Sequence, residues 1–279
     1  MALVMHAANN KNAWKGLIAA EYSGVEVELA RNFELGVSNR TPEFIKMNPM
    51  GKMPVLETPD GIVTESNTIA RYVTCLKPDN PLYGSSLIEN AKIEQWVDFA
   101  ATELDPSIAG WVYPRVGFRP FIQGVEELSI SNLKRIMEAL NSHLASNTYL
   151  VGNSVTLADV VMTCNLHPGF NRVMTKSFTS QYPHVERYYW TLVNQPNFRK
   201  VMGEAKQAES ILPLPSAQKP AQVAQTKEPE PEVKKVPAKD VSADKQEAPR
   251  PKLKNQLDLL PPSRMILDEW KRILGYVRS

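Results

Sequence analysis

The apolar and polar positions of the first 76 residues predict a small α/β domain. Residues 2–6 form a short apolar run that predicts a buried strand, and residues 25–29 alternate apolar and acidic side chains, as a half-buried strand does. Between them we expect a helix that is capped by Asn12 and stops at Ser23-Gly24, because glycine is common directly after a helix.

A short helix, a hairpin and a longer helix are expected next. The short helix begins at Thr41-Pro42, since proline is tolerated in a first turn. Pro54 opens a strand, and Asp60-Gly61 marks a tight turn into the next one. Ser66 is expected to cap the last helix, whose apolar stripe contains Ile69, Tyr72, Val73 and Leu76. This order of elements ends the α/β domain near residue 76.

From residue 85 to about residue 208 the pattern predicts helices alone. Ser86 and Glu89 have the spacing of a capping box, and the helix that they open is expected to end before Asp105-Pro106. Further helices are expected from Pro183 and Pro196. Another long helix carries a core-facing stripe that consists of Leu133, Ile136, Met137, Leu140 and Leu144.

A second capping pattern and a helix break lie within this helical region. Thr156 and Asp159 have the spacing of a cap, T-x-x-D, at the start of a helix. Pro168 lacks the N–H that would bond four residues back, so His167-Pro168-Gly169 is expected to kink or end that helix.

The last 68 residues change in composition. Residues 212–254 are rich in proline, lysine, alanine and glutamate, and such a charged linker is predicted to be disordered. Its charges alternate in sign, which favours a solvated spacer over a nucleic-acid-binding arm. Residues 255–279 include an amphipathic segment that begins at Ser263, and an isolated helix this short is marginal in water.

Composition excludes several classes of function. The net charge is +2, so no global field recruits nucleic acid or an anionic membrane. The sequence shows no secretory signal and no apolar run long enough to span a bilayer. Cys75 and Cys164 are expected to be buried, and their spacing forms neither a redox motif nor a zinc site. These features fit a cytosolic protein without structural disulfides.

The hairpin region is the strongest candidate for binding a ligand. A backbone that enters a strand through Met53-Pro54 presents the N–H and C=O of Met53 to a ligand, and the free N–H groups near Glu65-Ser66 suit a carboxylate. Together they favour a peptide-like ligand with an anionic end. The simpler alternative is that Pro54 only opens a strand and Ser66 only caps a helix.

The order of these residues resembles the glutathione-binding half of glutathione S-transferases. There, a cis-proline follows the backbone contact, and a Glu-Ser or Gln-Ser pair holds the gamma-glutamyl group. The resemblance implies an α+β thioredoxin-like domain at residues 1–82 and an all-α transferase C-terminal-like domain at residues 85–211. It makes Thr156 and Asp159 a structural cap of the central helix. The candidate glutathione-binding residues are Lys52, Met53, Pro54, Glu65 and Ser66.

Three segments narrow the resemblance: KGLIAAEYSG at 15–24, NRTPEFIKMNPMGKMPVLETPDG at 39–61, and LDLLPPSRMILDEWKR at 257–272. They resemble the gamma subunits of the eukaryotic translation elongation factor 1 complex, of the plant type. The resemblance implies a cytoplasmic scaffold that binds the nucleotide-exchange subunits (alpha/beta type) and, through them, the tRNA-carrying GTPase. In that family the segment at 255–279 opens a further domain, so we expect a shortened form.

Catalysis requires a group that stabilises the glutathione thiolate after the first strand. Residues 6–12 contain no hydroxyl or thiol. His6 is expected to be structural, Asn9 or Asn10 to offer only a weak hydrogen bond, and Lys11 to be solvated. The sequence therefore favours a protein without enzymatic activity, metal or required cofactor. It leaves open glutathione as a ligand, weak transferase turnover on small electrophiles, a homodimer, and an adaptor role in tRNA-synthetase assemblies.

Overall fold

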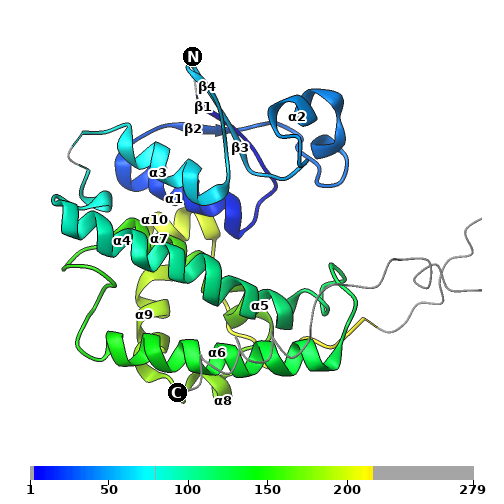
Figure 1. The fold of residues 1–279 in the computed structure, drawn as a ribbon, viewed down its shortest axis with the longest axis vertical. Coiled ribbons are helices and arrows are strands. Elements are labelled where there is room, and N and C mark those ends of the chain that lie inside the picture. Colours follow the sequence, from blue (N-terminus) through cyan, green and yellow to red (C-terminus); the bar gives the residue numbers. More distant parts are fainter. Residues whose placement is uncertain (1–2, 79, 216–279) are drawn as a thin grey trace, which may run out of the picture. The chain divides into compact units, whose positions relative to one another are not determined.

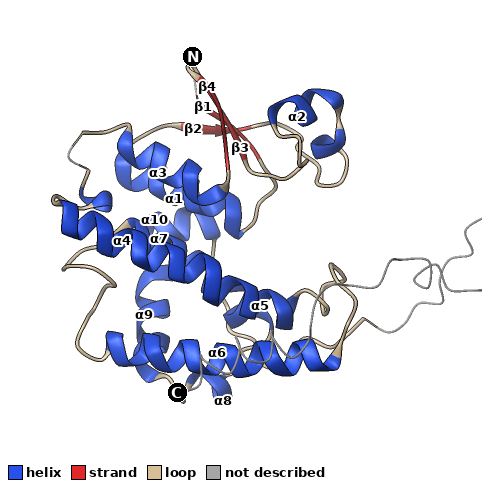
Figure 2. Cartoon of the chain, viewed as in Figure 1, coloured by secondary structure: helices blue, strands red, loops and turns tan. Residues whose placement is uncertain are grey.

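The computed structural model describes residues 3–78 and 80–215. Their first part is a mixed four-stranded sheet with helices, and their second part is helical (Figure 1, Figure 2). The α/β part consists of β1 (Leu3–His6), α1 (Lys11–Ser23), β2 (Val27–Leu29), a 3-10 turn (Ser38–Arg40), α2 (Pro42–Met47), β3 (Val55–Thr58), β4 (Gly61–Thr64) and α3 (Ser66–Cys75).

The sheet has the strand order β2-β1-β3-β4. β1 pairs in parallel with β2, and β3 is antiparallel to both β1 and β4. Leu56 is opposite Met5 on one side and Val63 on the other. Figure 1 shows α1 and α3 between this sheet and the helices of the second part. The buried side chains of Ile18 and Ile69 thus pack beneath Met5 and Leu56 in one core.

Three local predictions in this part are wrong by one or two residues. The side chain of Asn10, rather than Asn12, caps α1 by accepting the N–H of Asn12 at 2.9 Å. The hairpin turn is Pro59-Asp60, because Gly61 already pairs with Thr58. Glu65 occupies the cap position of α3, and Ser66 is the first helical residue.

The helical part adds a second set of elements. They are a 3-10 turn (Pro81–Tyr83), α4 (Leu87–Phe99), a π-helical turn (Ala100–Leu104), α5 (Asp105–Val112), α6 (Gln123–Leu144), α7 (Leu157–Arg172), α8 (Lys176–Thr179), α9 (Pro183–Val193) and α10 (Pro196–Met202). The predicted stripe on α6 is buried throughout, from Leu133 to Leu144.

The sequence predicted that the helix beginning at Leu87 ends before Asp105-Pro106. The structure differs, because helical backbone continues through Pro106. The π-helical turn continues it directly into α5. A wider turn absorbs the register change that proline imposes on the hydrogen-bond ladder, because Pro106 has no N–H to donate. The cap of α4 also differs from the capping box. Ser86 accepts the N–H of Glu89 at 3.3 Å, but the Glu89 carboxylate accepts from Ser85.

The sequence predicted that α7 kinks or ends at His167-Pro168-Gly169. The helix does not end there, because it continues to Arg172. Phe170, two residues beyond the proline, is fully buried and stacks on Tyr189 with ring centroids 3.8 Å apart. This aromatic packing and the bond from the N–H of Val173 to the Gly169 carbonyl hold the last turn of the helix. The chain after α10 then returns along α7, where Leu212 donates its N–H to the Arg172 carbonyl at 2.8 Å.

The start of α7 is fixed by a buried carboxylate. Oδ2 of Asp159 accepts the N–H of Thr156 at 2.8 Å and its hydroxyl at 2.9 Å. Oδ1 accepts the N–H of Leu150 at 2.9 Å and the hydroxyl of Tyr188 at 3.0 Å. Burial raises the pKa of Asp159, and these four donors oppose the rise. One side chain therefore ties together α7, α9 and the loop that precedes α7.

The α/β part and the helical part share one hydrophobic core. α1 packs against α7 and α10, and α3 also contacts α7. Trp14 of α1 meets the His167 ring edge-on at 5.1 Å, and Tyr22 packs against Phe198 of α10 at 6.0 Å.

The two cysteines differ from the prediction that both are buried. Cys164 is buried in α7, whereas Cys75 is exposed at the end of α3. Leu76, placed on the buried stripe by the sequence, is also exposed because the helix ends there. Most of the predicted linker and the whole amphipathic segment from Ser263 lie outside the described residues.

Candidate functional site

A cleft of about 610 Å³ brings together the five candidate glutathione-binding residues, Lys52, Met53, Pro54, Glu65 and Ser66. The α/β part supplies one wall. Ala101, Asp105 and Tyr113 of the helical part supply the other. The π-helical turn and the start of α5 therefore form part of the cleft, which the prediction of a helix end at that point did not reveal.

The backbone before β3 is held in place by side-chain amides. Asn48 donates to the carbonyl of Lys52 at 2.7 Å, and Asn39 donates to the carbonyl of Gly51 at 2.8 Å. Gly51 has φ +60, a conformation that favours glycine. The Met53–Pro54 peptide bond is cis. The segment thus reaches the cleft with a fixed backbone, while the Lys52 side chain is exposed.

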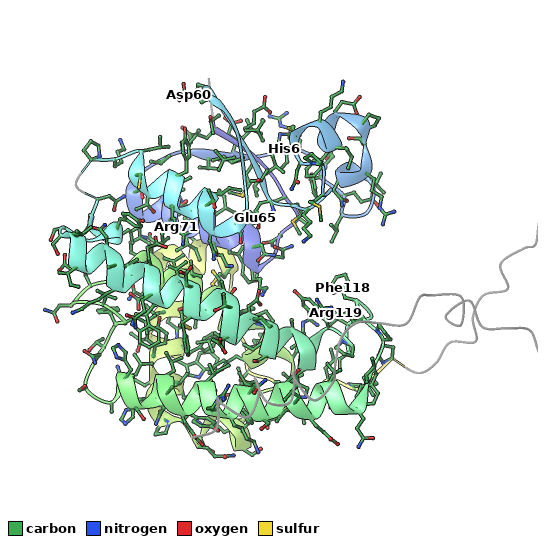
Figure 3. The ribbon with its side chains drawn as sticks, viewed as in Figure 1. His6, Asp60, Glu65, Arg71, Phe118 and Arg119 are labelled. Carbon is green, nitrogen blue, oxygen red and sulfur yellow. The ribbon has the colours of Figure 1, made fainter. Side chains whose placement is uncertain are left out.

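Another part of the cleft lining lies where β4 passes into α3, at Glu65 (Figure 3). Glu65 there has φ 65 and ψ 122, an unusual conformation for a residue with a side chain. Strained backbone of this kind occurs mostly at binding and catalytic sites. The free N–H groups of the first helical turn follow directly, and they suit an anionic group.

Lys15 lines the cleft, although the sequence did not single it out as a candidate. Its side chain is only 3% exposed, and it donates to Asn67 Oδ1 at 3.0 Å and to Ser66 Oγ at 3.4 Å. Burial, followed by the nearby charge of Lys11, lowers its pKa to about 8. The sequence did hold a signal, because Lys15 precedes the buried Ile18 and Ala19 by three and four positions, on the same helical face.

Lys11 is also buried, contrary to the expectation that it is solvated. It is 8% exposed and forms an ion pair with Asp105 of α5. The two residues are 94 positions apart, so no local pattern could have shown the pair. This ion pair joins the start of α1 to the start of α5 beside the cleft.

The other polar side chains after β1 are also engaged within the protein. Asn9 accepts the indole N–H of Trp14, Asn10 caps α1, and His6 Nε2 lies 3.2 Å from Glu57 Oε2. Asn12, which lines the cleft, offers an amide. The position that would activate a thiol therefore holds amides and a paired lysine.

These features define the class of protein. The fold and cleft are those of a glutathione S-transferase-like body, and the family models for the glutathione S-transferase N-terminal and C-terminal domains match residues 4–74 and 127–196. The GST-like domain of elongation factor 1-gamma from Saccharomyces cerevisiae superposes with a TM-score of 0.67 and 21% identity, covering 77% of this chain and 99% of that one. Glutathione transferase F2 from Populus trichocarpa gives a TM-score of 0.65, also with 21% identity, covering 72% and 97% of the two chains.

Curated relatives identify the family within this class. Elongation factor 1-gamma 2 of Oryza sativa is 65% identical over 286 residues, which cover all of this chain and 68% of that protein. Probable elongation factor 1-gamma 1 of Arabidopsis thaliana is 57% identical over 282 residues, with the same coverage. This chain belongs to the elongation factor 1-gamma family.

The described residues set two further limits on the site. None of their helices is long and apolar enough to cross a membrane. Within the same part of the chain, no group of three or more His, Cys, Asp or Glu side chains could hold a metal ion.

Proposed function

We propose that this chain is a non-catalytic scaffold subunit of the translation elongation factor 1 nucleotide-exchange complex. Its transferase-like body binds the exchange-factor subunit (alpha/beta type), which acts on the tRNA-carrying GTPase, and the assembly works in the cytoplasm. Relatives named elongation factor 1-gamma, which match 94% to 100% of this chain, support membership of that complex.

One observation supports the non-catalytic part of the proposal. A transferase must hold the glutathione thiol as a thiolate, and a hydroxyl, a thiol or a free cation serves this purpose. After β1 this chain has two asparagines with internal hydrogen bonds and a lysine already neutralised by Asp105. The segment directly after β1, where the transferases that this chain resembles place the activating group, therefore offers no hydroxyl, no thiol and no unpaired cation.

Direct binding tests the scaffold role. Full-length chain is titrated with purified exchange subunit by calorimetry, and we expect a dissociation constant of about 1 μM or lower, equivalent to about −8 kcal/mol. The chain alone should leave the nucleotide-exchange rate of the GTPase unchanged. Absence of binding at about 10 μM, or exchange activity of the chain by itself, would contradict the proposal.

Glutathione conjugation is the second candidate, and the cleft that joins Met53, Glu65 and Ser66 favours it. Retention on glutathione-agarose and conjugation of a small electrophile are measured on the same preparation. We expect retention with turnover well below about 1 s⁻¹, the low end for ordinary enzymes. Ser66→Ala should reduce retention, and exposed Ser131→Ala should not. Turnover at ordinary transferase rates would reject the non-catalytic assignment.

A further inference from the structure

Exposed apolar side chains gather at the hairpin between α5 and α6. Phe118 is 68% exposed, Ile122 57% and Leu128 62%, and Phe121 and Val125 are exposed as well. We call these five residues the hairpin patch. Figure 3 shows Phe118 on the connection between the two helices. Isolated apolar side chains are normal on a surface, but five exposed ones within eleven residues of one hairpin favour an interaction site.

The patch covers the loop before α6 and one face of the first turns of that helix. Val125 and Leu128 are three residues apart on α6, so they lie on one face of the helix, while Phe121 and Ile122 immediately precede its first turn. Leu133, Ile136 and Leu140 form a different row, which is buried in the core. The patch row continues with Asn132 and Arg135, because Arg135 follows Leu128 by seven residues. This face of α6 thus presents an apolar half followed by a cation.

The patch has an exposed arginine at each end. Arg119 lies over the ring of Tyr113 at 5.3 Å, and Arg135 is exposed two turns beyond Leu128. Neither forms an ion pair with a carboxylate among the described residues. Glu126 is paired with Arg115, and Glu127 accepts a hydrogen bond from Gln123 at 2.8 Å. Gln123 is neutral, so Glu127 keeps its charge. Within residues 118–135 the exposed charges without an ion pair are thus three positive ones, on Arg119, Lys134 and Arg135, and one negative one, on Glu127, and their balance is positive.

Hydrogen bonds, a ring contact and an ion pair hold the backbone of the hairpin patch in place. The N–H of Phe118 donates to the Tyr113 carbonyl at 3.0 Å, and the two rings meet edge-on at 5.8 Å. Arg115 joins α5 to Glu126 of α6, with Nη2 2.9 Å from Oε1. A preorganised surface loses little side-chain and loop freedom on binding.

We propose that the hairpin patch is the docking site for an acidic amphipathic helix of a partner protein. The stretch from Ile122, the N-cap of α6, to Arg135 is about 20 Å long at 1.5 Å per residue, so it accommodates a helix of about 14 residues. Its apolar face covers Phe118, Ile122 and Leu128, and its carboxylates pair with Arg119 and Arg135. The inference rests on the proposed function, according to which the docking helix belongs to the exchange subunit.

Calorimetry with purified exchange subunit tests the patch in the full-length chain. We expect Phe118→Ser/Ile122→Ser/Leu128→Ser to weaken binding at least 30-fold, as loss of interface anchors does. Arg119→Glu/Arg135→Glu should weaken it at least 10-fold at about 50 mM salt and less at about 300 mM, where screening is stronger. The control Leu29→Ser/Val37→Ser removes exposed apolar side chains elsewhere and should stay within about 2-fold of wild type.

The outcomes separate the two levels of the proposal. A wild-type chain that does not bind the exchange subunit refutes the proposed function, and the docking inference falls with it. A wild-type chain that binds, with patch variants of equal affinity and native circular dichroism, refutes the docking inference alone. A photo-crosslinker at Val125 should capture an acidic helical segment of the exchange subunit, and capture of a basic segment would overturn the inference.

Two other occupants would also overturn it. Sedimentation equilibrium compares the mass of the wild-type chain with that of the triple-serine variant, and loss of a dimer would assign the patch to a second copy of this chain. Cosedimentation with vesicles of phosphatidylcholine and phosphatidylserine tests a lipid surface. We expect the same mass for both chains and no vesicle binding that depends on the patch.

Discussion

Replacing Asp159 with alanine is expected to lower the free energy of unfolding by about 3–5 kcal/mol, the range for breaking a buried charged network. The N–H groups of Thr156 and Leu150 and the hydroxyl of Tyr188 would all lose their acceptor. Each buried donor left without a partner costs about 1–3 kcal/mol. Because these donors belong to different segments, the loss loosens the start of α7, the loop before it and α9 together.

Urea denaturation and thermal melting measure this effect. At about 2–4 °C per kcal/mol for a body of this size, the melting temperature should fall by about 10 °C. Asp159→Asn retains one acceptor oxygen and should lose less stability than the alanine variant. Glu138→Ala removes an exposed carboxylate from α6 and should change stability by no more than about 0.5 kcal/mol. A melting temperature for Asp159→Ala within 2–3 °C of wild type would show that the network contributes little.

Replacing Lys15 with methionine should stabilise the protein at pH 7 and change how its stability depends on pH. Burial lowers the pKa of Lys15 from 10.5 to about 8 in the folded chain. The unfolded chain therefore binds this proton more tightly, and unfolding takes up a proton between about pH 8 and pH 10.5. The free energy of unfolding of the wild type consequently rises as the pH increases through that window, by at most about 3 kcal/mol, because the cost of burying a charged Lys15 disappears.

Methionine retains much of the side-chain volume and carries no charge, so the variant lacks the pH-dependent contribution of Lys15 to the free energy of unfolding. At pH 7 it should be more stable than wild type by up to about 3 kcal/mol, and the difference should shrink towards pH 10.5. Guanidinium denaturation at pH 7, 8.5 and 10 tests the trend, with exposed Lys92→Met as the matched control. Parallel stability curves for Lys15→Met and wild type would show that Lys15 titrates alike in the folded and unfolded chains.

The long regular elements could be predicted from the sequence because their apolar positions repeat over several turns. The buried stripe of α6 and the buried face of α9 are examples. The cap of α1 was misplaced by two residues because Asn9, Asn10 and Asn12 are all able to cap, and sequence alone does not rank them. The continuation through Pro106 was missed because a π-helical turn has no local composition signal.

The cleft was only half predictable. Met53, Pro54, Glu65 and Ser66 lie within 14 positions of one another, so their order already indicated a common site. Asp105 and Tyr113 come from the helical part and reach the cleft through packing of distant segments. Lys11 was expected to be solvated and Lys15 was overlooked, because lysine is seldom buried. Their partners, Asp105 for Lys11 and Asn67 for Lys15, are also far away in sequence.

The shared core determines whether the α/β part and the helical part can be expressed as separate fragments. Trp14 and Tyr22 of α1 pack on His167 and Phe198, so cutting the chain between α3 and α4 would leave aromatic surface on both fragments open to water. Neither fragment would then fold as it does in the intact body, and both would tend to aggregate. The two transferase-like segments are therefore expected to fold as one unit, and mapping of partners by fragments must keep them joined.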